Sequence, residues 1–342
     1  MPFNAIDLFS GCGGLTEGMH QAGFTTKVAV EIVPLAARAY KMNHPEAVVI
    51  QKDIRLINAE EIRKKLNGEP LHLLAGCPPC QGFSSIRRLN KPQCVEDDRN
   101  SLVLEYLRLV RELEPIAIMM ENVPALKDYE VFQQVVEELH GLGYNPDVQV
   151  VNVKNYGVPQ RRKRLVMVGM LNNTVKVADG NGIRRTVRDM IENLATPEDT
   201  QDPLQKIVSK HTPKVLEMIK KLPHDGGSRK DLPDEYILEC HKKKNVGFND
   251  VYGRLRWDDY STTITGGCLN PSKGRYLHPE QNRVITPREA ALLQSFPEDY
   301  KFPTDISKTA LALLIGNALP PEFSRIQSEN IYRLLQTQFK EQ

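Results

Sequence analysis

The stretch AIDLFSGCGG, residues 5–14, sets an apolar segment directly before a turn rich in glycine. Its β-favouring residues predict a strand over 5–9. The spacing of apolar residues then predicts a helix over 15–22 that ends at Gly23. A strand, a bare turn and a helix in this order let the backbone approach a ligand at the N-terminus of the helix. The stretch therefore predicts a ligand-binding unit at one edge of an α/β sheet.

The same alternation of strand and helix patterns continues through the first half of the chain. Further strands are predicted over 27–30, 47–50, 71–75, 116–120, 147–153 and 165–170. This rhythm is typical of an α/β protein with a doubly wound, mostly parallel sheet and helices on both faces.

The alternation stops after Met170 and returns near Ile285, where Thr286, Pro287 and Glu289 predict a capping box in front of a helix. A final apolar stretch over 310–315 is followed by Gly316 and a C-terminal helix. We therefore expect a large domain over residues 1–170, a smaller inserted domain over 171–284, and a return to the large domain over 285–342.

The composition is that of an ordinary globular protein. Of the 342 residues, 40% are hydrophobic and 26% are charged, which excludes a disordered or fibrous chain. No run approaches the ~20 apolar residues of a membrane helix, and no secretory leader is recognisable, so we expect a cytoplasmic protein without membrane contact. Six cysteines are too sparse for a disulfide framework. The net charge of +2 says little about partners.

The glycine turn favours a nucleoside without phosphates as its ligand. It lacks the G-x-G-x-x-G spacing that binds a dinucleotide pyrophosphate. Glu31, at the end of the second predicted strand, suits ribose hydroxyls, and Asp53, after the third, suits an adenine amino group. The alternative is a tight structural turn with two unrelated surface acids.

A second informative stretch is GCPPCQGFS, residues 76–84, which follows the fourth predicted strand. A thiol there would face the ligand crevice at the carboxyl edge of the sheet, and Cys80 becomes a strong nucleophile once ionised. Cys77 and Cys80 could instead form a redox pair or half of a zinc site. We find neither a thioredoxin-like context nor a second ligand pair, so we expect no metal.

An acid and a basic run follow at the same predicted edge. Glu121 ends the fifth strand and points to the same crevice as Cys80. The run QRRKR, residues 160–164, leads into the last strand of this half and would place fixed positive charge beside the acid and the thiol. A solvated or phosphate-contacting basic patch is the simpler alternative for this run.

Six blocks in order resemble the signature motifs of the DNA cytosine-5 methyltransferases. They are DLFSGCGG (7–14), PPCQGFS (78–84), ENV (121–123), QRRKR (160–164), Arg288 with QSFP (294–297), and GNALP (316–320). The resemblance covers about residues 4–170 and 284–325. The segment between them resembles the family's variable target-recognition domain. Leu319 is a minor departure, since the family more often has valine there.

The resemblance implies a Rossmann-like fold dependent on S-adenosyl-L-methionine, which becomes S-adenosyl-L-homocysteine. Residues 1–170 would form the catalytic domain and 171–284 the target-recognition domain. The matching catalytic residues are Cys80, Glu121, Arg162 and Arg164. The positions that match the cofactor pocket are Asp7, Phe9, Gly11, Cys12, Gly13, Gly14, Glu31, Ile32, Asp53, Ile54, Pro79, Leu102, Asn317 and Ala318.

The resemblance also implies a partner and a setting. It predicts a monomer that acts on double-stranded DNA in a bacterial cytoplasm, as part of a restriction-modification system, and that flips its target cytosine out of the duplex. A tRNA cytosine-5 methyltransferase shares the catalytic blocks, although the long variable segment favours DNA. A catalytically silent DNA-binding protein would lack Cys80, Glu121 or the QRRKR run. A nicotinamide oxidoreductase is disfavoured by the missing dinucleotide fingerprint.

Overall fold

The chain folds into two compact units. The structure is a computed structural model that describes residues 3–79, 102–237 and 250–340. The first unit comprises Met1–Tyr156, Lys163–Asn181 and Leu319–Gln342, and the second comprises Gly157–Arg162 and Gly182–Ala318.

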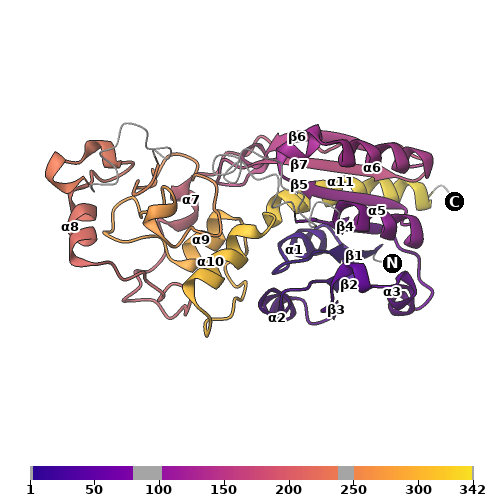
Figure 1. The fold of residues 1–342 in the computed structure, drawn as a ribbon, viewed down its shortest axis with the longest axis horizontal. Coiled ribbons are helices and arrows are strands. Elements are labelled where there is room, and N and C mark those ends of the chain that lie inside the picture. The colour runs from indigo at the N-terminus through magenta and orange to yellow at the C-terminus, as the bar shows by residue number, and fades with distance from the viewer. Residues whose placement is uncertain (1–2, 80–101, 238–249, 341–342) are drawn as a thin grey trace. The chain divides into compact units, whose positions relative to one another are not determined.

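A seven-stranded sheet forms the centre of the first unit (Figure 1). Its strands follow the order β3-β2-β1-β4-β5-β7-β6. In chain order they are β1 (Phe3–Leu8), β2 (Phe24–Val30), β3 (Val48–Ile50), β4 (Leu73–Gly76), β5 (Ala117–Asn122), β6 (Asp147–Asn152) and β7 (Lys163–Met170). Each strand overlaps a predicted one, with ends that shift along the chain.

The strands β3, β2, β1, β4 and β5 pair in parallel, whereas β7 is antiparallel to both β5 and β6. This mostly parallel, doubly wound sheet confirms the predicted fold class. The sequence pattern does not reveal the direction of β7. Because β7 runs the opposite way, its first residues lie at the edge where β4 and β5 end, and Leu165 pairs with Asn122. This reversal positions the site described below.

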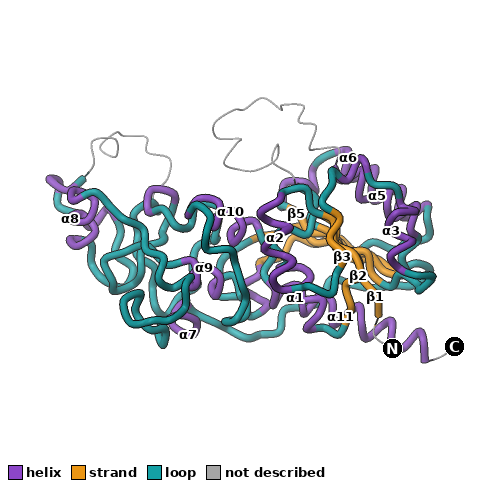
Figure 2. The backbone as a smooth tube through the Cα atoms, turned by 90° about the horizontal axis from the view of Figure 1, so that it is seen from below, coloured by secondary structure: helices purple, strands orange, loops and turns teal. Residues whose placement is uncertain are grey.

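Helices cover both faces of the sheet (Figure 2). On one face lie α3 (Ala59–Leu66), α5 (Leu102–Leu113) and α6 (Glu130–Gly141). On the other lie α1 (Gly14–Gln21), α2 (Pro34–Asn43) and α11 (Pro321–Lys340). Short 3-10 helices span Ile54–Leu56, Pro124–Asp128 and Val153–Tyr156. Among the described residues, no helix is both long and apolar enough to cross a membrane.

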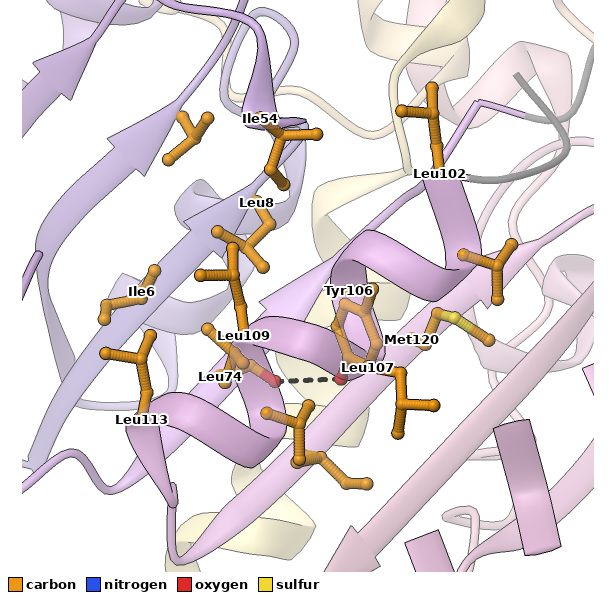
Figure 3. Packing of buried hydrophobic residues seen from close by; sticks show 14 of the residues in the cluster. Ile6, Leu8, Ile54, Leu74, Leu102, Tyr106, Leu107, Leu109, Leu113 and Met120 are labelled. Carbon is orange, nitrogen blue, oxygen red and sulfur yellow. Dashed lines mark hydrogen bonds between the residues drawn. The ribbon is translucent and has the colours of Figure 1, made fainter. Parts of the chain in front are cut away.

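The main hydrophobic core lies between the sheet and α3, α5 and α6. Val28 and Val30 of β2 face this core, whereas Ala29 between them packs with Tyr40 of α2, because successive strand residues point to opposite faces. Tyr106 of α5 is fully buried, and its hydroxyl donates to the carbonyl of Leu74 at 3.2 Å (Figure 3). This bond satisfies the only polar atom of the side chain, so the ring can fill the core.

The C-terminal helix α11 packs closely on α1. A Cβ atom at Gly18 would lie 2.4 Å from both the Pro321 carbonyl oxygen and the Ser324 Cβ, so the two helices could not approach each other as they do with any larger residue. The hydroxyl of Ser324 donates to the carbonyl of Leu15 at 2.7 Å. Segments from opposite ends of the chain therefore complete the first unit together.

The second unit consists mainly of loops and short helices. Its α-helices are α7 (Val187–Ile191), α8 (Pro213–Lys221), α9 (Pro287–Leu293) and α10 (Lys308–Asn317). The predicted capping box is confirmed: Thr286 and Glu289 satisfy each other's backbone N–H groups at the start of α9. Glu289 also forms a buried ion pair with Arg283, 2.6 Å between Oε1 and a guanidinium nitrogen.

The unit boundaries differ from the predicted domain boundaries. The chain passes to the second unit after Asn181 and returns to the first at Leu319, whereas the sequence pattern places these changes at 170/171 and 284/285. The helices α9 and α10 therefore belong to the second unit. The reason is a set of buried polar contacts that join them to residues 157–162 and 264, described below. The functional roles of the segments stay a prediction.

Candidate active site

The glycine turn after β1 is held by Glu31. The backbone turns sharply here, since Phe9, Gly11 and Gly13 all have positive φ angles of 59°, 55° and 97°. Oε2 of Glu31 accepts a hydrogen bond from the Gly11 backbone N–H at 2.8 Å, and Oε1 accepts from that of Val33 at 2.7 Å. Burial raises the pKa of Glu31, and these backbone bonds oppose that rise. Glu31 thus fixes the turn that we predict to bind the cofactor.

Asp7, at the end of β1, is a fully buried carboxyl group. Its Oδ2 accepts a hydrogen bond from the Thr16 hydroxyl at 2.7 Å, and that hydroxyl lies 2.9 Å from the hydroxyl of Tyr40. Burial raises the pKa of Asp7 to about 8. Oδ1 of Asp7 and the hydroxyl of Ser10 are buried without a hydrogen-bond partner in the described structure. A ligand with an ammonium group would satisfy such a carboxylate oxygen.

The other predicted cofactor residues of the first unit differ in their surroundings. Cys12 is buried, and burial raises the pKa of its thiol to about 12. Ile54 and Leu102 belong to the main core, whereas Ile32 is 56% exposed. Asp53 caps the 3-10 helix that follows it and pairs with Arg55, with Nη2 of Arg55 2.5 Å from Oδ2. That carboxylate therefore has a local structural role in this conformation.

A second group of polar side chains lies where β4 and β5 end and β7 begins. Oε1 of Glu121 is 2.5 Å from Nε of Arg164, in an ion pair whose side chains are 11% and 16% exposed. Cys77 hydrogen-bonds Glu121, and burial, together with the charge of Glu121, raises the pKa of its thiol far above the usual range. Asn122 donates to the Pro78 carbonyl at 2.9 Å and so ties β5 to the segment leading to Cys80.

Cys80, the predicted nucleophile, lies outside the described residues. The described neighbours of its segment are Cys77, Pro78 and Pro79, which follow β4. A thiol as strongly protonated as Cys77 is a poor nucleophile and a poor partner for redox exchange. This chemistry leaves Cys80 as the better candidate of the two. The structure brings Glu121 and Arg164 together, and the antiparallel direction of β7 is the reason.

Three further predicted site residues belong to the second unit, where a buried polar network connects them. Arg162 is 4% exposed, and its Nη1 donates to the carbonyls of Ile264 and Gly316 at 2.8 and 2.9 Å. Asn317 and Ala318 follow Gly316 at the end of α10. In this conformation Arg162 thus supports the backbone beside the GNALP block, and its predicted contact with substrate stays untested.

Glutamines reinforce the same network. Nε2 of Gln160 donates to Oε1 of Gln294 at 2.5 Å, and its Oε1 accepts from the Ile264 backbone N–H at 3.1 Å. Nε2 of Gln294 in turn donates to the Ile315 carbonyl at 2.7 Å. The QRRKR, QSFP and GNALP blocks are therefore bound together by hydrogen bonds. The sequence gives no indication of these pairings, because the partners lie far apart along the chain.

Sequence reasoning also missed Thr16, Tyr40 and Asn122 as parts of the site. Thr16 lies in the first turn of α1, just after the glycines. Its contact with Asp7 becomes apparent only when the positions of β1 and α1 in the fold are known. Tyr40 comes from α2. Asn122 directly follows Glu121 in the ENV block, and this position could have indicated that it belongs to the site.

The fold and site define an α/β methyltransferase, a doubly wound sheet with an acid-anchored glycine turn at its carboxyl edge. Residues 3–333 match the family model described as C-5 cytosine-specific DNA methylase. The chain therefore belongs to the C-5 cytosine-specific DNA methylase family, whose members are DNA cytosine-5 methyltransferases.

Similar proteins extend over nearly the whole chain. It is 36% identical to the type II methylase M.HgiDII of Herpetosiphon aurantiacus, over 97% of this chain and 95% of that protein. It is 30% identical to the type II methyltransferase M1.HphI of Haemophilus parahaemolyticus, over 98% and 88%. A crystal structure of a putative DNA modification methyltransferase encoded within a prophage of E. coli superposes with a TM-score of 0.76, at 27% identity over 98% and 99% of the two chains.

Proposed function

We propose that this chain transfers a methyl group from S-adenosyl-L-methionine to C5 of a cytosine flipped out of duplex DNA, through a covalent bond between Cys80 and C6. The observation that carries the proposal is the Glu121–Arg164 pair at the sheet edge where the segment leading to Cys80 begins. An acid and a fixed cation beside a thiol are the groups that activation of cytosine requires, since C5 by itself is a poor nucleophile.

The protein's residues act first on the base. The Cys80 thiolate adds to C6, and Glu121 protonates or hydrogen-bonds N3, so that the electron pair of the C5–C6 double bond becomes available at C5. Arg164 orients Glu121 and offsets the negative charge of the thiolate. None of these groups reaches a stacked base, so the cytosine must leave the duplex. After methylation, loss of the C5 proton to a base or water lets Cys80 leave by β-elimination.

The first unit supplies the residues to hold the cofactor. When bound, S-adenosyl-L-methionine supplies an electrophilic methyl group on its sulfonium. The unpaired Oδ1 of Asp7 and the hydroxyl of Ser10 fit the amino-acid part of this molecule, which carries an ammonium and a carboxylate. Glu31 would bind ribose hydroxyls while keeping the turn in place, and Asp53 the adenine. We also propose a cofactor-binding role for Asn317 and Ala318.

The relatives support a role in DNA modification. Type II methylases are named among them at 30–36% identity, and we infer that this chain modifies a specific duplex sequence within a restriction-modification system. Residues 171–284 would read the base edges, while phosphate contacts set the orientation. Bisulfite sequencing of duplex DNA treated with the purified protein should show methylcytosine within one sequence context, and a tRNA substrate should stay unmodified.

The covalent step is tested with DNA that carries 5-fluorocytosine at the target position. Addition of the thiolate and methylation can both occur on this analogue, but elimination requires loss of a proton from C5, and fluorine cannot leave as a cation. With S-adenosyl-L-methionine present, the protein should form an adduct that survives denaturing electrophoresis and maps by peptide mass to Cys80. Cys80→Ser should form none, because an alcohol is not ionised or soft enough.

The other cysteines provide matched controls for this experiment. Serine at Cys12, Cys77, Cys94, Cys240 or Cys268 should leave trapping possible. An adduct that persists in Cys80→Ser, or that maps to another cysteine, would refute the assignment.

A further inference from the structure

A chain of hydrogen-bonding side chains joins β1, α1 and α2 in the first unit. Asp7 belongs to β1, Thr16 to α1 and Tyr40 to α2, and all three are fully buried. The Thr16 hydroxyl donates to Oδ2 of Asp7 at 2.7 Å and lies 2.9 Å from the Tyr40 hydroxyl. A hydroxyl has one proton to donate, and Thr16 gives its proton to Asp7. Tyr40 must therefore be the donor to Thr16.

Tyr40 is held as a fixed donor at the start of this chain. Its ring packs with Ala29 and Ala47 and lies 4.9 Å from the ring of His44. Burial raises the pKa of Tyr40 well above its ordinary value, so the phenol keeps its proton. The two hydrogen bonds polarise each other because they share the Thr16 oxygen. Together they fix the position of Oδ2 of Asp7.

Asp7 has hydrogen-bond donors but no counter-charge. Its Oδ1 is buried without a hydrogen-bond partner in the described part of the chain. The described titratable groups that interact electrostatically with it are all acids: Glu31, Tyr40, Cys12 and Cys77. A buried carboxylate is costly unless a cation pairs with it. The Thr16 bond favours the ionised form, and these neighbours do not supply the positive charge that this form requires.

We propose that Thr16 and Tyr40 are positioning residues that hold Asp7 as the counter-charge for the ammonium group of the cofactor. This inference rests on the proposed function and adds to it the residues that act behind Asp7. Asp7 lies near the end of β1, directly before the turn that Glu31 holds. An ammonium group carries both a positive charge and N–H donors, so it suits the unpaired carboxylate oxygen. Thr16 and Tyr40 touch no ligand and act through Asp7 alone.

Two ligands separate this role from a general structural one. S-adenosyl-L-homocysteine carries the ammonium group, whereas 5′-methylthioadenosine has the same nucleoside and a thioether but no amino-acid part. A residue that acts through Asp7 should affect the affinity for the first ligand and leave that for the second unchanged. A residue that merely supports the fold should affect both.

The charge of Asp7 also predicts a dependence on pH. Burial raises the pKa of Asp7 to about 8, and only the ionised form attracts an ammonium group. The affinity for S-adenosyl-L-homocysteine should therefore rise by about tenfold per pH unit between about pH 6 and 8, whereas that for 5′-methylthioadenosine should not. Asp7→Asn should abolish the rise. Thr16→Val removes a bond that lowers the pKa, so the rise should move to higher pH.

Calorimetric titration of the full chain with the two ligands is the test. At neutral pH, Thr16→Val should weaken S-adenosyl-L-homocysteine binding by about tenfold or more and Tyr40→Phe by about threefold, with 5′-methylthioadenosine binding unchanged. Thr16→Ser keeps the hydroxyl and should restore wild-type affinity. Tyr144→Phe is the matched control, because it removes another buried hydroxyl, which donates to the Pro115 carbonyl. It should change the affinity for neither ligand.

The outcomes distinguish this inference from the proposed function. An equal loss of both ligands in Thr16→Val would overturn the inference alone, as would wild-type affinity for S-adenosyl-L-homocysteine that does not change with pH. A wild type that binds neither ligand would overturn the proposed cofactor and this inference together. If Thr16→Val does not fold, the wild-type pH profile and Tyr40→Phe still decide the question.

Discussion

At the scale of single residues, the contact between Glu121 and Arg164 supports the proposed action of Glu121 on N3 of the target cytosine. Arg164 is placed by β7, so its guanidinium is fixed without help from the substrate. Replacing Glu121 by glutamine keeps a hydrogen-bonding group but removes the proton donor. We expect Glu121→Gln to slow methylation by about 10²-fold or more, because general acid assistance contributes ~10²–10⁴. Single-turnover assays measure this step directly, and full activity there would remove Glu121 from the mechanism.

Glu31 holds the glycine turn, and we propose that it also binds the cofactor; a substitution can separate these two roles. Glu31→Ala loses the bonds to the Gly11 and Val33 backbones, whereas Glu31→Gln keeps a side-chain acceptor for one of them. We expect Glu31→Ala to weaken S-adenosyl-L-methionine binding by about 1–3 kcal/mol, with a smaller loss in Glu31→Gln. Asp53→Ala should also weaken binding. Calorimetric titration is the measurement, and Glu137→Ala on the exposed face of α6 is the control. Affinity unchanged in both alanine variants would remove the proposed pocket.

The residue types in the sequence indicate which chemistry the candidate site could support, but they do not indicate which contacts each side chain makes. Cys80 and Glu121 are predicted from their positions at the ends of strands, and Arg164 from the basic run that leads into one; their roles stay predictions. Arg162, however, is buried against backbone carbonyls, and Arg254, in a stretch we interpret as recognition material, is fully buried with donors to the His278 and Gln281 carbonyls. An arginine in a sequence carries five donors but no indication of which acceptors the fold will bring to them.

At the scale of secondary structure elements, strand positions were predictable and strand direction was not. Short apolar runs between helical patterns located all seven strands of the sheet. The direction of β7 depends on how the chain returns after β6, and β6 and β7 pair as antiparallel neighbours across a loop that contains no long helix. The apolar residues of β7 are compatible with a parallel or an antiparallel strand. The direction nevertheless decides whether Arg164, near the start of β7, lies beside Glu121 of β5.

The capping box of α9 contains a buried ion pair that should control stability. Glu289 binds Arg283, the Thr286 backbone and Gln205, and both charged side chains are almost fully buried. Glu289→Gln would leave Arg283 buried without its counter-charge, so we expect a loss of about 3–5 kcal/mol in the free energy of unfolding. Urea unfolding measures it. Glu217→Gln, which breaks an exposed pair with Lys220, should change stability little. Equal effects of the two substitutions would contradict this interpretation.

The same pair predicts a dependence on pH. Burial alone would raise the pKa of Glu289, but the Arg283 hydrogen bonds and charge hold it below the ordinary value of 4.5. A carboxyl group whose pKa is lowered by folding stabilises the protein above its unfolded pKa, and that contribution disappears as the pH falls through the folded pKa. The stability difference between wild type and Glu289→Gln should therefore be full at neutral pH and shrink below pH 4.5.

At the scale of the whole molecule, the second unit is an insertion with its own buried network. Excision of residues 182–318 with a short linker should leave cofactor binding measurable but weakened, because it removes Asn317 and Ala318, for which we propose a role in cofactor binding. Sequence-preferring DNA binding should disappear, since base-edge contacts specify sequence. Calorimetry and competition binding with duplexes of different sequence measure the two effects, after circular dichroism has shown that the remainder folds. Retained sequence preference would place recognition in the first unit.

The domain organisation was predictable only in outline. The break in strand-helix alternation marks the insertion, because a segment without that periodicity cannot extend a doubly wound sheet. The pattern cannot show that α9 and α10 join the second unit. That assignment depends on Gln160 and Arg162, whose buried hydrogen bonds to Leu293, Gln294 and Gly316 each span more than a hundred residues.

The close packing of α11 on α1 at Gly18 has a consequence for how the protein is made. During synthesis β1 and α1 are translated before their packing partner α11, and residues 182–318 of the second unit are translated between them. The apolar face of α1 therefore stays exposed while the second unit is translated. Exposed apolar surface of this kind favours aggregation. Slow translation of the second unit should lengthen this interval, because the first unit is complete only after α11 has packed on α1.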